Sequence, residues 1–134
     1  MKYEEFLGQV QARARLADME EAVRATRATL QTLAERVSEG GADSLAAQLP
    51  TEIGYYLKIN APALEKFGFQ EFIKRVTEKE GGKVDEPDAA HHARAVLSVV
   101  TDATSGEMPK ICEQLPNEFN PLFESGSEGK MPAP

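Results

Sequence analysis

The feature that most constrains this chain is an internal duplication. Three blocks of sequence occur twice: YEEFLGQV at residues 3–10 and FQEFIKRV at 69–76, RATL at 27–30 and RAVL at 94–97, and QLPTE at 48–52 and QLPNE at 114–118. Phe6 and Gln48 are 42 residues apart, and Phe72 and Gln114 are also 42 residues apart. A repeat of this length is a supersecondary unit that buries its apolar face against a neighbouring unit. The sequence therefore predicts two tandem copies of one unit.

The apolar residues of each copy follow the 3.6-residue period of a helix rather than the alternation of a strand. The first predicted helix carries its stripe at Tyr3, Phe6, Leu7, Val10 and Ala14, and the corresponding helix of the second copy at Phe69, Phe72, Ile73 and Val76. A second long helix follows in each copy, with Val23, Thr26, Leu30, Leu33 and Val37 in the first and Ala89, Ala93, Val96, Leu97 and Val100 in the second. This pattern predicts an all-α fold.

Capping residues mark where these helices begin and end. Asp18 and Asp85 precede the second helices and can accept a hydrogen bond from a free backbone N–H of the first turn. Glycines at 40–41 and at Gly106 can supply the left-handed positions that end the second helices. A short third helix is expected near residues 44–49 and 108–115, where a following proline stops it. A fourth is expected at 51–57 and 117–123, since proline suits a helix start.

The expected organisation is a first repeat at residues 1–57, a linker at 58–68, a second repeat at 69–123 and a disordered tail at 124–134. The tail is rich in Gly, Ser and Pro, a composition typical of disorder. A unit of about 57 residues buries only about 60% of its surface, so it is marginally stable alone. We therefore expect the two repeats to share one core as a pseudo-two-fold bundle of about four helices each.

Charge and cysteine content exclude several classes of function. The 134 residues carry a net charge of -7, and such a field repels nucleic acid and anionic membranes. One cysteine, Cys112, allows neither an intramolecular disulfide nor a thiolate metal cage. The N-terminal residues lack the apolar stretch of a signal peptide, and no run is long enough for a membrane helix. The sequence is thus typical of a cytoplasmic protein.

The duplicated motifs resemble the bacterial family called domain of unknown function 2267. The resemblance rests on the EEF opening, the RAxL block and the QLPxE turn, and it extends over residues 3–123. It implies an all-helical prokaryotic protein without an assigned activity, and it supplies no catalytic residues. Cys112 departs from the pattern, because the first copy has Ala46 at that position.

No catalytic or metal-binding group emerges from the sequence. His91 and His92 are adjacent on a helix and point about 100° apart, so they cannot chelate one ion together. Asp88 and His91 have the spacing of a di-metal bundle motif, but the first copy has Arg24 at the position of the second ligand. Cys112 has no histidine within a helical turn to activate it and is interpreted as a packed residue. We therefore predict no metal, no cofactor and no catalysis.

Two arginines recur at one position of the second helix, as Arg27 and Arg94, and two glutamates recur as Glu52 and Glu118. Our first hypothesis pairs Arg27 with Glu52 and Arg94 with Glu118, so that each ion pair ties the second helix to the fourth. In the alternative, the two arginines face each other across the pseudo-dyad and grip an anion, with Tyr55 and Tyr56 as further candidates.

These observations favour a protein-binding or assembly module without catalysis, which presents a groove or helix face to another chain or to a second copy. The alternative is a binder of a small anionic or amphipathic ligand at the junction of the two repeats. Neither nucleic acid nor a membrane is an expected partner.

Overall fold

The computed structural model describes residues 1–58 and 65–123, and this part of the chain is all-α, as predicted. In chain order its elements are α1 (Tyr3–Ala14), α2 (Met19–Arg36), α3 (Glu39–Ala46), α4 (Thr51–Lys58), α5 (Phe69–Lys79), α6 (Glu86–Ala103), α7 (Met108–Glu113) and the 3-10 helix η1 (Asn117–Leu122). No helix in these two ranges is both long enough and apolar enough to cross a membrane. The predicted tail and most of the predicted linker lie outside the described residues.

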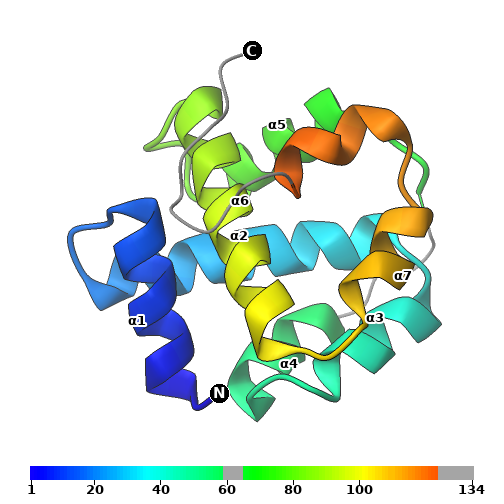
Figure 1. Ribbon diagram of the computed structural model, residues 1–134. Coiled ribbons are helices and arrows are strands. Elements are labelled where there is room, and N and C mark those ends of the chain that lie inside the picture. The colour runs from blue at the N-terminus through cyan, green and yellow to red at the C-terminus, as the bar shows by residue number, and fades with distance from the viewer. Residues whose placement is uncertain (59–64, 124–134) are drawn as a thin grey trace.

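The two longest helices, α2 and α6, pack against each other and cross near the middle of the molecule (Figure 1). Each of the other long helices contacts both of them: α1 packs on α2 and α6, and α5 packs on α6 and α2. The short element α4 packs on α2, and η1 packs on α6. The chain therefore builds its centre from α2 and α6 and surrounds that centre with the other helices.

One apolar cluster fills the space between these helices, and the predicted helix stripes supply most of it. In α1 and α5 the stripe residues are buried except for the two that open it, Tyr3 and Phe69, which are half-buried. In α6 all five predicted positions are buried. Val23 of α2 is half-buried, and Val37 is buried just after that helix ends. The helical period thus identified the core-facing side of all four long helices.

The predicted caps of the second helices are confirmed. The Asp18 carboxylate accepts from the backbone N–H of Glu21 at 2.9 Å, and the Asp85 carboxylate accepts from that of Asp88 at 3.0 Å. Each bond satisfies one of the N–H groups that a helix start leaves without an intrahelical partner.

The prediction that glycines 40 and 41 end the second helix is wrong. α2 ends at Arg36, Val37 is extended, and α3 already begins at Glu39, with the Ser38 hydroxyl accepting from the Gly41 N–H at 3.1 Å. Both glycines lie inside α3, and neither has positive φ. The absence of a side chain at Gly41 leaves room for the Gln114 side chain, because a Cβ at this position would lie 2.7 Å from Nε2 of Gln114. Gly106 does have a left-handed φ of 77°, in the loop between α6 and α7.

The fourth short helix differs between the two halves. In the first half α4 is an α-helix, as predicted, whereas residues 117–122 form the 3-10 helix η1, which contains Pro121. In an α-helix beginning at Asn117, residue 121 would donate to the Asn117 carbonyl. Proline has no N–H, and its ring clashes with that carbonyl, so the segment takes the tighter 3-10 form.

Two glutamine side chains fasten α3 and α7 to each other's half of the chain. Gln48 lies just after α3, and its Oε1 accepts from the backbone N–H of Ser105 at 2.6 Å. Gln114 lies just after α7, and its Oε1 accepts from the backbone N–H of Ser38 at 2.7 Å. Gln48 also donates to the Glu107 carboxylate at 3.2 Å. We call these two Gln-to-Ser bonds the glutamine clasp.

A cluster of charges joins α5 to α2 and to the segment before α5. The Arg75 guanidinium forms ion pairs with Glu35 at 3.1 Å, Glu65 at 3.0 Å and Glu71 at 2.9 Å. It also lies over the Phe67 ring, 3.9 Å from the ring centroid. These three hydrogen-bonded carboxylates raise the pKa of Arg75, so the guanidinium stays charged, and the cluster positions residues 65–68 against α2 and α5.

Candidate binding groove

The C-terminal end of α3 and the whole of α4 form a helical hairpin with an unusually close crossing. Gly54 allows this approach, because a Cβ there would lie 2.8 Å from the carbonyl oxygen of Ala46. The QLP turn between the helices follows from Pro50, which cannot continue α3 and precedes the first residue of α4, Thr51. The AAQLP block and the glycine therefore set the geometry of this hairpin together.

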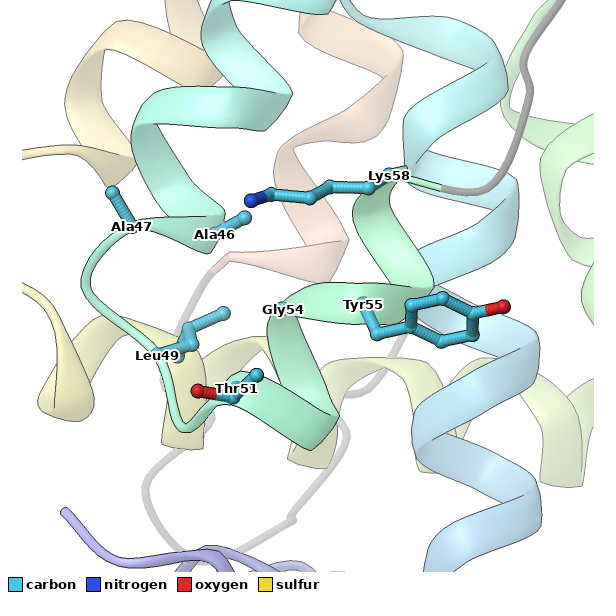
Figure 2. A pocket seen from close by; sticks show the side chains of 7 residues that line it. All are labelled: Ala46, Ala47, Leu49, Thr51, Gly54, Tyr55 and Lys58. Carbon is cyan, nitrogen blue, oxygen red and sulfur yellow. The ribbon is translucent and has the colours of Figure 1, made fainter.

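An open groove with a volume of about 350 Å³ lies along this hairpin (Figure 2). Its lining comes from α3, α4 and the turn between them, and consists of Ala46, Ala47, Leu49, Thr51, Gly54, Tyr55 and Lys58. The floor is apolar and its side chains are small, since it includes Ala46, Ala47 and Gly54. Figure 2 shows the Tyr55 ring pointing away from this floor, while the Lys58 side chain extends across the groove toward Ala46.

The chemistry of the groove suits binding. It brings together one hydroxyl of Thr51, one phenol of Tyr55 and one ammonium of Lys58, without a carboxylate or an imidazole. Tyr55 is 61% exposed. Lys58 takes part in none of the ion pairs between described residues. The groove thus offers an apolar surface with an aromatic rim and one available cation.

The two recurring arginines occupy different environments. Arg27 is exposed on α2, whereas Arg94 is fully buried in α6. Neither Arg27–Glu52 nor Arg94–Glu118 is among the ion pairs that the structure shows between described residues. Glu118 instead accepts from the backbone N–H of Phe69 at 3.4 Å, at the start of α5. This contact places a carboxylate at the positive end of a helix, a favourable position.

The tyrosines separate as well. Tyr56 is half-buried, and its pKa is raised by desolvation and by the nearby Tyr3, while Arg27 opposes the shift. Tyr3, Arg27 and Tyr56 therefore lie close enough to interact electrostatically. Tyr55 packs edge-on against Tyr56, with 6.4 Å between ring centroids, and lines the groove. Of the four residues of the predicted junction site, only Tyr55 lines the groove, and the groove lies within the first half of the chain.

One buried polar pair was not anticipated from the sequence. Nδ1 of His92 lies 3.0 Å and 3.1 Å from the two carboxylate oxygens of Glu80, and both residues are buried. Glu80 caps the end of α5 and His92 lies in α6, so the pair joins the two helices. The pKa of the neighbouring His91 is lowered, first by desolvation and then by the charges of His92 and Arg94. No motif marks a pair like this, because the fold alone brings the two residues together.

The described residues hold no group of three or more His, Cys, Asp or Glu side chains that could bind a metal. Burial raises the pKa of the Cys112 thiol. An activated nucleophile needs a shift in the opposite direction, so this cysteine has the character of a packed residue.

The described elements define an all-helical domain with an open groove on a short helical hairpin. The family described as "Uncharacterized conserved protein (DUF2267)" matches residues 3–122. The chain therefore belongs to this family, as the duplicated motifs predicted. No curated protein matches the sequence.

Proposed function

We propose that this protein is a protein-binding or assembly module without a catalytic step, and that the groove between α3 and α4 is its docking surface. The groove itself carries the proposal: small side chains form its floor, and Tyr55 stands exposed at its rim. Tyrosine is enriched among the residues that dominate binding energy at interfaces. An apolar side chain of a partner would exclude water from the floor, and the exposed Tyr55 ring would add contact area at the rim.

We further infer that residues 1–57 and 69–123 are tandem copies of one unit that share a core. Three observations support this inference. The elements run in the order long, long, short, short, twice over. The contact of α1 with α6 corresponds to that of α5 with α2 when the halves are exchanged. The glutamine clasp is reciprocal, because each Gln of the repeated QLP motif accepts from a Ser N–H of the other half.

The proposal includes a cytoplasmic location. A chain with one cysteine, Cys112, forms no intramolecular disulfide, and most disulfide-stabilised domains of similar size are secreted.

The test is capture of partners on immobilised protein, with Ala47→Phe as the variant that fills the groove. Ala47 is exposed, so the larger side chain occupies the groove without entering the core. The matched control is Ala12→Phe, at an exposed position of α1. We expect Ala47→Phe to reduce the amount of bound partner at least about tenfold, a typical loss for a blocked hot spot, and Ala12→Phe to leave it unchanged. Equal binding by both variants would overturn the proposal.

A small amphipathic ligand is the second candidate occupant. The volume of about 350 Å³ lies in the range of small-molecule pockets, and Lys58 could pair with an anionic group. Native mass spectrometry of the purified protein would then show a bound mass that Ala47→Phe removes. A spectrum of the bare chain, together with loss of a protein partner in Ala47→Phe, would decide for the module.

A further inference from the structure

The exposed face of α4 carries opposite charges on either side of Tyr55. Glu52 precedes Tyr55 by three residues and Lys58 follows it by three, and all three side chains are exposed. Residues three apart lie along one broad side of a helix, and Glu52 and Lys58 are about 9 Å apart along the axis. Neither charge takes part in an ion pair between described residues.

From this pattern we infer that the partner docked on the α3–α4 face is a second copy of the chain, held by an antiparallel α4–α4 contact. The inference rests on the proposed function and names its partner. A two-fold axis perpendicular to α4 at Tyr55 reverses the direction of the second helix. Each residue before Tyr55 then faces the residue equally far after it in the other copy, so Glu52 of each copy meets Lys58 of the other.

The same face also carries both halves of a packing contact. Tyr55 projects from the rim, and the groove floor beside it consists of small side chains (Figure 2). An apolar cavity of about 150 Å³ holds a benzene molecule, so a groove of about 350 Å³ has room for the Tyr55 ring of a second copy. A two-fold interface needs one patch that is complementary to itself. This patch contains a projecting ring, Tyr55, and a groove that can receive it. It also contains an acidic and a basic side chain, Glu52 and Lys58.

Charge swaps provide the test, measured by analytical ultracentrifugation of the full chain at about 0.15 M salt, where the repulsion between net charges is screened. We expect a concentration-dependent dimer. Glu52→Lys alone and Lys58→Glu alone should each raise the dimer dissociation constant at least about tenfold, since two attractive contacts per dimer become two repulsive ones. The double variant Glu52→Lys/Lys58→Glu restores both pairs with reversed signs, and should return the constant to within about threefold of the original value.

Matched controls are Glu4→Lys on α1 and Lys74→Glu on α5, which change the net charge equally at exposed positions elsewhere. They should leave the dissociation constant unchanged, and circular dichroism should show the same helix content in all variants. A monomer at every concentration up to about 0.5 mM, or a dimer that ignores the swaps, would overturn the inference. In that event, capture of another protein that Ala47→Phe abolishes would leave the proposed function standing, whereas equal capture by Ala47→Phe and Ala12→Phe would remove both.

Discussion

Gly54 shows how one missing methyl group sets the shape of the groove. A Cβ at this position would lie 2.8 Å from the Ala46 carbonyl oxygen and 3.3 Å from its Cα, and both are backbone atoms. Backbone cannot yield as a flexible side chain can, so the two helices must separate if a larger residue is introduced. The groove floor depends on this approach, because Ala46 and Gly54 both line it.

Gly54→Ala is therefore expected to lower the free energy of unfolding by about 1–3 kcal/mol, the range of overpacking in a tight core. Urea denaturation of the full chain measures this change. Gly40→Ala is the matched control, because Gly40 also lies in a short helix and a Cβ there meets nothing within 4 Å. This substitution should stabilise the protein by about 0.5–1 kcal/mol, since alanine favours the helix. Equal effects at the two positions would contradict the close crossing.

At the residue scale, the sequence predicted which residues cap a helix better than it predicted how deeply a polar side chain is buried. Asp18 and Asp85 were recognisable as caps because a cap acts on the backbone of its own helix. Arg27 and Arg94 occupy equivalent positions in α2 and α6, yet one is exposed and the other buried. The apolar period identifies the core-facing side of each helix, but how far a neighbouring arginine is covered depends on which other helices pack over it, and the period does not specify this.

At the scale of elements, α5 is held to α2 by the charges around Arg75 as well as by apolar packing. The hydrogen bond from Arg75, followed by its charge, lowers the pKa of Glu65 below the ordinary value of 4.5. A carboxylate with a lowered pKa in the folded state contributes stability above its unfolded pKa and loses it as the pH falls through the folded pKa. The contribution of Arg75 to stability is thus greatest near neutral pH and fades in acid.

Arg75→Met should reduce the free energy of unfolding by about 1 kcal/mol at neutral pH, because Glu35, Glu65 and Glu71 lose the cation with which all three form ion pairs. The difference from the original protein should shrink below about pH 4.5 as Glu65 becomes protonated. Thermal unfolding from pH 7 to about pH 3 measures both effects. Lys74→Met provides the control, since Lys74 is exposed on the same helix. A difference that stays constant with pH would show that Arg75 acts through packing alone.

The element boundaries that sequence reasoning missed have local physical causes. α3 begins five residues earlier than predicted, at Glu39, because the Ser38 hydroxyl caps it. The Gln114 side chain of the other half packs against Gly41 in its first turn, a tertiary contact that could not be seen in the local sequence. The 3-10 form of η1 was accessible from the sequence, since Pro121 stands where an α-helix would need a donor to the Asn117 carbonyl.

At the scale of the whole molecule, the repeated QLP motif holds the two halves together. The proline of the motif accounts for the turn in each half, and the role of the proline could be read from the sequence. The role of the glutamine, a hydrogen bond to the other half, could be seen only in the structure. Gln48 and Gln114 each reach the N–H of a serine next to a short helix of the other half. The recurrence of the motif at the same spacing of 42 residues predicted a duplicated unit. It did not predict the groove, because the groove depends on the crossing of α3 and α4 rather than on the repeat.

The glutamine clasp can be tested from both sides, because removing a glutamine from one half should affect a serine N–H in the other half. Gln114→Ala leaves the half-buried N–H of Ser38 without its acceptor and should lower the free energy of unfolding by about 1–2 kcal/mol. Gln48→Ala exposes the Ser105 N–H to water, which can replace the lost bond, so its effect should be smaller. Amide hydrogen exchange separates the two variants: exchange at Ser38 should accelerate in Gln114→Ala and exchange at Ser105 in Gln48→Ala, each at least about tenfold. Gln9→Ala, at an exposed position of α1, should change neither rate. If each variant instead accelerated exchange only within its own half, the clasp would not join the halves, and their association would depend on the packing of α1, α2, α5 and α6 and on the charges around Arg75.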